Sequence, residues 1–164
     1  MRFILIKLSL LAIAVGVCAS PTLAAETVTA ELNVSAEVVD TCVFTSVSPL
    51  AFATIDTTKD TTETSIGSVE IACTSGHTGV SVTLDGGANA SGGVRSMISS
   101  ASDTVPYKVY TQANHTGEIA IDGNAWSGDL SAAVAQTISV YGMVPKGNYL
   151  LGNYADMITV TMNY

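Results

Sequence analysis

The feature that most constrains the fold is a long stretch with a two-residue period, Thr27–Phe44 (TVTAELNVSAEVVDTCVF). Apolar residues occupy every even position from Val28 to Val38, and polar residues occupy every odd position from Thr29 to Glu37. This alternation is typical of a β-strand with one buried face. Strands of globular domains are usually about 3–10 residues long, so the stretch is too long for one strand of a sandwich. Either a turn interrupts it or its first half extends beyond the domain.

Two interpretations of this stretch follow. It is an ordinary edge strand of its own domain, or its first half is a strand that the chain donates to another subunit. The donated face would consist of the alternating apolar residues Val28, Ala30, Leu32, Val34 and Ala36.

Residues 1–24 have the organisation of a secretory signal peptide. Arg2 and Lys7 supply the positive start, and Leu8–Val17 is an apolar run too short to span a membrane. Thr22-Leu23-Ala24 provides small residues at the usual cleavage positions, so we expect the mature chain to begin at Ala25.

The mature chain is expected to have the size of one domain and a strongly acidic surface. Removal of 24 residues leaves 140, and removal of Arg2 and Lys7 leaves four Lys and Arg against 14 Asp and Glu, a net charge of −10. Such a charge argues against nucleic acid and against anionic membranes, both of which attract basic surfaces.

The cysteines indicate a disulfide. Cleavage removes Cys18 and leaves Cys42 and Cys73, and a pair of cysteines in an exported chain suggests a bridge. A zinc site would need further ligands, for which the sequence offers the histidines His77 and His115. We therefore expect a disulfide and no metal or cofactor.

Beyond Phe44, short β-prone segments alternate with turn residues, and no stretch shows a sustained helical period. This pattern indicates an all-β, antiparallel sandwich. The expected strands are Leu50–Ile55, Ser65–Cys73, Gly79–Asp85, Arg95–Ile98, Val105–Thr111, Glu118–Ile121, part of Ala132–Val144, and Ala155–Tyr164. Asp122-Gly123-Asn124 is expected to form a turn, with Trp126 as a packed aromatic or a loop anchor.

No arrangement of residues points to catalysis. His77 and His115 lie in short polar turns, and no nucleophile elbow or metal-ligand spacing accompanies them. The glycine-rich run DGGANASGG at 85–93 lacks the lysine and the following helix of a phosphate loop. We expect that the protein is not an enzyme. A secreted sandwich that binds a carbohydrate through such loops is the alternative.

Four segments carry a resemblance to a known family, the spore coat protein U domain, which includes the pilins of archaic (Csu-type) chaperone–usher pili. Their order matches that family, and the alternating strand leading into Cys42 resembles it as well. The segments are LDGGANASGG at 84–93, VPYKVYTQA at 105–113, AQTISVYGMVP at 135–145 and GNYADMITVTMNY at 152–164.

The resemblance implies an immunoglobulin-like sandwich that lacks its last strand. In similar pilins a periplasmic chaperone lends a strand during export. At the outer-membrane usher, the N-terminal extension of the next subunit replaces it. The resemblance thus implies a structural subunit of an extracellular fimbria that supports adhesion and biofilm formation, with a secreted spore or surface coat protein as the alternative.

These expectations divide the chain into a signal peptide (1–24), a donor-strand extension (25–36) and a pilin domain (37–164). The groove that accepts the donated strand, or contacts the chaperone, should be lined partly by the last alternating segment. Its apolar positions are Ile158, Val160, Met162 and Tyr164.

Overall fold

The computed structural model describes residues 26–59 and 61–164. The expected signal peptide, residues 1–24, lies outside them. The chain divides into an N-terminal unit that ends at Ala36 and a domain, Glu37–Tyr164. All regular elements of the described residues are β-strands, and none of these residues forms a helix of the length and hydropathy needed to cross a membrane.

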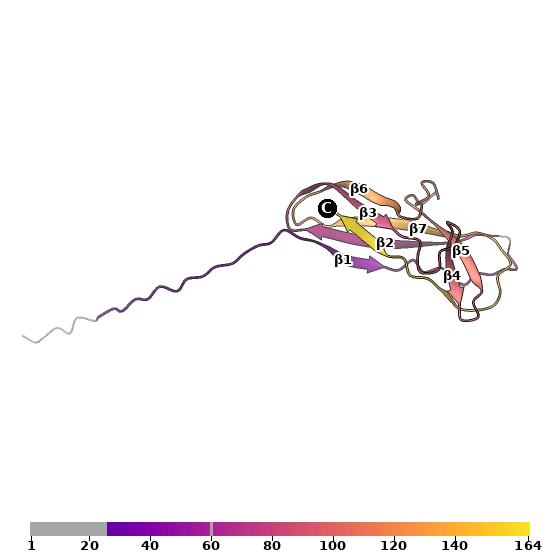
Figure 1. Ribbon diagram of the computed structural model, residues 1–164, viewed down its shortest axis with the longest axis horizontal. Coiled ribbons are helices and arrows are strands. Elements are labelled where there is room, and N and C mark those ends of the chain that lie inside the picture. The colour runs from indigo at the N-terminus through magenta and orange to yellow at the C-terminus, as the bar shows by residue number, and fades with distance from the viewer. Residues whose placement is uncertain (1–25, 60) are drawn as a thin grey trace, which may run out of the picture. The chain divides into compact units, whose positions relative to one another are not determined.

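The domain consists of two antiparallel sheets (Figure 1). The larger sheet has the strand order β1-β2-β7-β5-β4-β8, and the smaller has the order β6-β3-β9. The strands of the larger sheet are β1 (Cys42–Ser48), β2 (Glu63–Cys73), β7 (Gln136–Val144), β5 (Thr104–Tyr110), β4 (Arg95–Ser99) and β8 (Tyr154–Ala155). Those of the smaller sheet are β6 (Gly123–Leu130), β3 (His77–Leu84) and β9 (Val160–Asn163).

The core lies between the two sheets and explains the two-residue period of the central strands. In β2 the inward residues Val69, Ile71 and Cys73 are buried, whereas the residues between them are partly exposed. They pack against Val80 and Val82 of β3, which are fully buried on the facing sheet. Inward and outward positions must alternate along a strand that has one face in a core. The antiparallel sandwich expected from the sequence is confirmed.

Most of the expected strands are present, and three expectations are wrong. Leu50–Ile55 forms no strand, and Glu118–Ile121 contributes only an isolated bridge between Glu118 and Tyr110. Two residues of the expected turn at 122–124, Gly123 and Asn124, already belong to β6, which pairs with β3; Trp126 lies in β6 and packs against the core. The sequence of β6, GNAWSGDL, is rich in residues that disfavour strands, so its conformation depends on pairing with β3.

The long alternating stretch is only partly a strand in the domain. Its last three residues, Cys42–Phe44, belong to β1, which continues to Ser48. Residues 26–41 form no strand. The interpretation of the whole stretch as one edge strand of its own domain is therefore wrong.

The expected disulfide between Cys42 and Cys73 is present. The two cysteines face each other across the β1–β2 ladder. A bridge of this kind stabilises a fold chiefly by restricting the unfolded chain.

A buried arginine ties the two sheets together. Arg95 of β4 is 5% exposed, and its guanidinium donates to four backbone carbonyls. The acceptors are Leu84 (3.0 Å), Asp85 (2.9 Å), Ile119 (2.6 Å) and Ala120 (3.0 Å). These carbonyls lie where the chain leaves β3 and approaches β6. Arg95 supplies a donor to the carbonyls of Asp85 and Ile119, and a second donor to those of Leu84 and Ala120, which also accept the backbone N–H groups of Asp122 and Gly123.

Arg95→Met should lower the free energy of unfolding by at least about 3 kcal/mol, because buried carbonyls lose their donors. Urea unfolding of the purified domain measures this loss. The control is Lys108→Met, which removes the exposed pair with Glu118 (2.8 Å) and should cost at most about 1 kcal/mol. Equal losses in the two variants would contradict the role given to Arg95.

Candidate strand-acceptor groove

Two strand edges on the same side of the sandwich have no partner among the described residues. β9 is the last strand of the smaller sheet and pairs only with β3. β1 is the first strand of the larger sheet and pairs only with β2. Each strand therefore presents a row of backbone N–H and C=O groups that can pair with a further strand.

The apolar side chains of β1 are unusually exposed for a sandwich strand. Val43 is 49% exposed, Phe44 41% and Val47 62%. The opposite edge is also incompletely covered, since Val160 and Met162 of β9 are only partly buried against the core. A strand placed between β1 and β9 would cover apolar surface on both sides.

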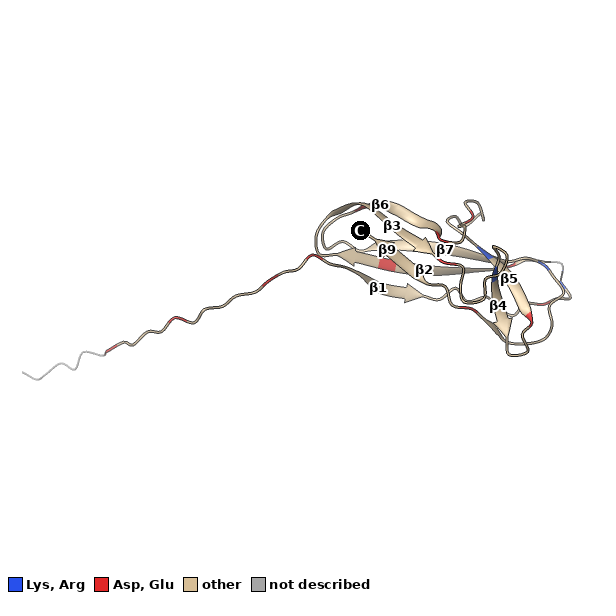
Figure 2. Ribbon diagram, viewed as in Figure 1, with Lys and Arg blue, Asp and Glu red and all other residues tan. Residues whose placement is uncertain are grey.

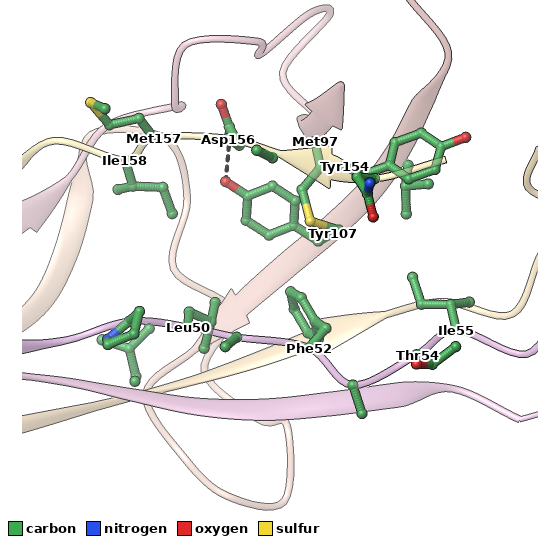
Figure 3. A pocket seen from close by; sticks show the side chains of 18 of the residues that line it. Leu50, Phe52, Thr54, Ile55, Met97, Tyr107, Tyr154, Asp156, Met157 and Ile158 are labelled. Carbon is green, nitrogen blue, oxygen red and sulfur yellow. Dashed lines mark hydrogen bonds between the residues drawn. The ribbon is translucent and has the colours of Figure 1, made fainter. Parts of the chain in front are cut away.

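An open cavity of about 860 Å³ lies where β1 ends and β9 begins, and Val47, Ser48 and Val160 contribute to its lining. Figure 3 shows the side chains of its two walls. The segment with Leu50, Phe52 and Ile55 forms one wall. The segment from Tyr149 to Ile158 forms the other. The floor reaches the core at Leu84, Val105, Tyr107 and Val140. An apolar cleft of this size is typical of a site that binds a ligand or a partner.

The wall from Tyr149 to Ile158 is fixed by the carboxylate of Asp156. The hydroxyl of Tyr107 donates to Asp156 Oδ2 at 2.6 Å (Figure 3), and Asn89 donates to Oδ1 from its backbone N–H (3.2 Å) and its side-chain amide (2.9 Å). A Cβ at Gly87, whose φ is +80°, would collide with this carboxylate. Gly87 is thus needed for the close approach of the DGGAN turn to Asp156.

Asp85 fixes the next part of the same wall. Its Oδ1 accepts the backbone N–H groups of Thr159 (2.8 Å) and Gly87 (2.8 Å). Burial tends to raise the pKa of Asp85, but these hydrogen bonds outweigh it and hold the pKa below its ordinary value. An ionised Asp85 therefore joins the end of β3 to the residue that precedes β9.

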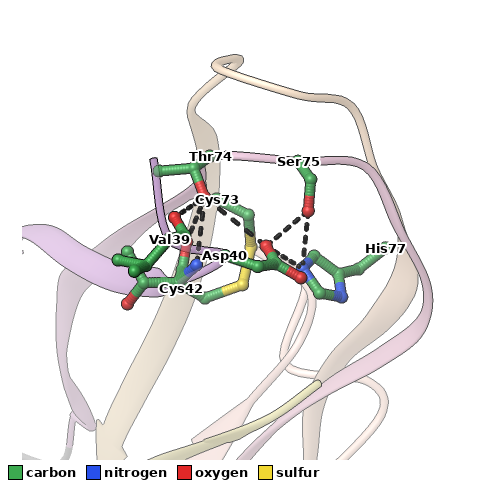
Figure 4. Close-up of a disulfide and its surroundings, with 8 residues drawn as sticks. Val39, Asp40, Cys42, Cys73, Thr74, Ser75 and His77 are labelled. Carbon is green, nitrogen blue, oxygen red and sulfur yellow. Dashed lines mark hydrogen bonds and ion pairs between the residues drawn. A yellow bond between two sulfur atoms is a disulfide. The ribbon is translucent and has the colours of Figure 1, made fainter. Parts of the chain in front are cut away.

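Polar side chains anchor the chain where it enters β1 (Figure 4). Thr74 Oγ1 accepts from the Thr41 N–H (3.0 Å) and donates to the Val39 carbonyl (3.1 Å). Asp40 accepts from the Ser75 hydroxyl, and its Oδ1 lies 3.1 Å from Nε2 of His77. The Ser75 bond, followed by that of His77, lowers the pKa of Asp40. The domain is thereby held from Val39 onward.

This cluster contains a serine, a histidine and an aspartate, but it is not arranged as a catalytic triad. Ser75 Oγ and Asp40 Oδ1 both approach the same ring nitrogen of His77, at 3.3 and 3.1 Å. In a triad the aspartate binds the nitrogen that does not face the serine. The arrangement serves as an anchor for the start of β1.

The structure places the expected site residues in two groups. Of the acceptor residues, Ile158 and Val160 line the cavity, Met162 is half-buried, and Tyr164 lies with its ring centroid 5.3 Å from that of His77. All five expected donor residues are exposed, with Val28 at 93%, Leu32 at 88% and Val34 at 88%.

Sequence reasoning missed the wall formed by residues 49–55. The alternation of LAFATI predicted a strand, and this segment does line the cavity, but it pairs with no other strand. The sequence signal for Asp85 and Asp156 was the glycine-rich turn, in which Gly87 leaves room for the carboxylate of Asp156 from a distant segment.

The fold and the groove define an incomplete antiparallel sandwich with an open place for one strand. The family model for the Spore Coat Protein U domain matches residues 28–161. The chain therefore belongs to the spore coat protein U family, as its sequence motifs indicated.

One solved structure supports the same fold, and a second is more distantly similar. The CsuC–CsuE chaperone–tip adhesion subunit pre-assembly complex from archaic chaperone–usher Csu pili of Acinetobacter baumannii contains a chain that matches with a TM-score of 0.55 and 19% identity. The match covers 77% of this chain but 40% of that one. A chaperone–tip adhesin complex of CFA/I fimbriae matches with a TM-score of 0.42 and 11% identity, over 70% of this chain and 37% of that one. No curated protein matches the sequence.

Tyr107→Phe should loosen the groove wall, because Asp156 loses a donor in a partly buried setting. Burial and the nearby Asp156 raise the pKa of Tyr107, so its hydroxyl keeps its proton. We expect a loss of about 1.5–3 kcal/mol in the free energy of unfolding, measured by urea titration. The matched control is Tyr154→Phe, whose more exposed hydroxyl donates to the Leu150 carbonyl (2.8 Å) and should contribute about 1 kcal/mol or less. An unchanged midpoint for Tyr107→Phe would contradict this role.

Proposed function

We propose that the chain is a structural subunit of an extracellular fimbria, assembled by donation of one strand from each subunit to the next. One observation carries the proposal. The domain has an open apolar cavity between two unpaired edges, and the same chain has an exposed segment with the alternation that such a cavity accepts.

An added strand would complete both the hydrogen bonding of the groove's edges and the packing of its cavity. The backbone of the added strand pairs with the bare edges, and its alternate side chains enter the cavity. Burying Val28, Leu32 and Val34 contributes about 1.5–3 kcal/mol each, and the alanines contribute less. The polar residues between them, including Glu31 and Asn33, then face solvent.

The direction of the added strand follows from the fold. The donor segment leaves its domain at the end where β1 begins, and β9 ends there too, since His77 contacts both Asp40 and Tyr164. If the donor ran parallel to β9, both neighbours of a subunit would need to occupy this same end. An antiparallel donor emerges at the opposite end and leaves room for both neighbours.

A subunit that donates one strand and accepts one forms a head-to-tail contact that does not close on itself, so a filament results. We infer that Val34 and Ala36 of the donor lie over the cavity between Phe52 and Tyr107, and that Val28 and Ala30 lie beside Met162 and Tyr164.

The same groove accounts for the proposed partners. An empty groove exposes apolar surface and two strand edges, which promotes aggregation. We propose that a periplasmic chaperone occupies it during export and that an outer-membrane usher exchanges the chaperone for the next subunit. The solved complex of a tip adhesion subunit with its chaperone, which has the same fold, supports this proposal.

The charge distribution fits a role in assembly better than nucleic-acid binding. The Lys and Arg residues of the described chain lie toward the end of the domain that carries β4 and β5 (Figure 2). Arg95 is buried, Lys59 pairs with Asp56 and Lys108 pairs with Glu118. The described residues therefore provide no basic stripe along which a phosphate backbone could bind. We propose no catalytic role.

Leu32→Arg should abolish fibre assembly, because it places a charge in an apolar cavity at a cost of several kcal/mol. The subunit should still fold with its chaperone, since position 32 lies outside its own core. Asn33→Arg is the matched control: it adds the same charge on the outward face and should leave assembly intact. Gel filtration and electron microscopy of the purified variants measure polymer formation.

Normal filaments from Leu32→Arg would contradict donation of this segment. So would a stable, folded monomer that lacks residues 25–35 and receives no added strand, because the groove would then need no occupant.

A further inference from the structure

Four potential metal ligands converge beside the disulfide (Figure 4). The sulfurs of Cys42 and Cys73 and a ring nitrogen of His77 all lie within 4.8 Å of one another. A carboxylate oxygen of Asp40 lies 3.1 Å from His77 Nε2. These residues come from four places in the fold: the segment before β1, β1 itself, the end of β2 and the start of β3.

The fold brings the two sulfurs together without needing the bond between them. Cys42 and Cys73 are direct partners in the β1–β2 ladder, and the pairing continues through Val43 with Ala72. Beyond the cysteines, the Thr74 N–H donates to the Thr41 carbonyl at 2.9 Å. The reduced chain therefore keeps both thiols at the same corner.

The donor set is that of a zinc site. Thiolate, imidazole and carboxylate groups are the ligands that Zn²⁺ binds in tetrahedral geometry, with bonds of about 2.0–2.3 Å. Ligand atoms on such a tetrahedron lie about 3.3–3.8 Å apart. The separation between Asp40 and His77 already approaches this range. The sulfur-to-nitrogen separations, which are at most 4.8 Å, need to contract by at most about 1.5 Å, and the two sulfurs must move apart once the disulfide is reduced.

We propose that this corner binds Zn²⁺ in the reduced chain, through the thiolates of Cys42 and Cys73, the imidazole of His77 and the carboxylate of Asp40. Binding releases the two thiol protons and transfers no electrons. The metal replaces the disulfide as the link between β1 and β2, and it adds a direct link to β3.

Zinc binding and disulfide formation exclude each other, because both use the same two sulfurs. The chain is synthesised with thiols, so the metal site precedes the bridge. A disulfide oxidant removes two electrons from the thiolates, forms the Cys42–Cys73 bond, releases Zn²⁺ and becomes two thiols itself. Bound zinc therefore slows oxidation until the thiolates dissociate from the metal.

Cobalt(II) provides the probe, because its spectrum reports thiolate ligation. The full mature chain is reduced with a phosphine, which takes up the oxygen of water as the disulfide becomes two thiols, and is titrated anaerobically with Co²⁺ and then Zn²⁺. We expect one equivalent of Co²⁺ to give sulfur-to-metal charge-transfer bands and tetrahedral d–d bands, both abolished by Zn²⁺. His77→Ala and Asp40→Asn should each weaken Zn²⁺ binding by at least about tenfold.

His115→Ala is the matched control, since His115 packs on Tyr110 and lies outside this corner; its Zn²⁺ affinity should equal that of the unmodified chain. Zn²⁺ should slow oxidation by glutathione disulfide in the unmodified chain and have a smaller effect in His77→Ala. Circular dichroism shows whether the metal-bound chain is folded. Absence of charge-transfer bands, unchanged affinity in His77→Ala, or binding by an unfolded chain alone would overturn the proposal.

Discussion

The structure depends on two strand edges that have no partner among residues 26–59 and 61–164. β9 and β1 border an apolar cavity, and each could complete its hydrogen bonds only with a further strand. A soluble sandwich normally blunts or covers such edges, because they pair readily with other chains. Here the exposed apolar side chains of Val43, Phe44 and Val47 on β1 further favour association of this edge with another chain. We propose that this surface is half of an interface.

Buried polar groups keep the groove open and shaped. Arg95 holds the carbonyls at the end of β3 and before β6, Asp85 holds the start of the last segment, and Asp156 is held by Tyr107 and Asn89. Apolar contacts alone would allow the two walls to collapse onto each other, whereas directed hydrogen bonds fix where each wall lies. Apart from Arg95, these residues belong to the segments by which the sequence resembles its family, so the family motifs include much of the hydrogen-bonded frame of the groove.

The sequence predicted those parts of the fold whose pattern is local. β2, β3, β5 and β7 alternate between a buried and an exposed face, and two cysteines in an exported chain allow one pairing. β6 and the wall at residues 49–55 were not predictable, because the first is fixed by pairing with β3 and the second by packing without pairing. Likewise, the apolar face of residues 28–36 could be predicted from its alternation in the sequence. The contact of Asp40 with His77 could not, because it depends on a turn that joins distant segments.

The central claim is that residues 26–36 of one copy lie antiparallel to β9 of another. Disulfide cross-linking between copies tests it directly, with one cysteine in the donor and one at Asn163, near the end of β9. Thr29→Cys should cross-link to Asn163→Cys and give a ladder of covalent oligomers, whereas Ser35→Cys, about 20 Å further along an extended strand, should not. A ladder from the Ser35 pair alone would reverse the direction, and the absence of any cross-link between copies in assembled material would contradict strand donation.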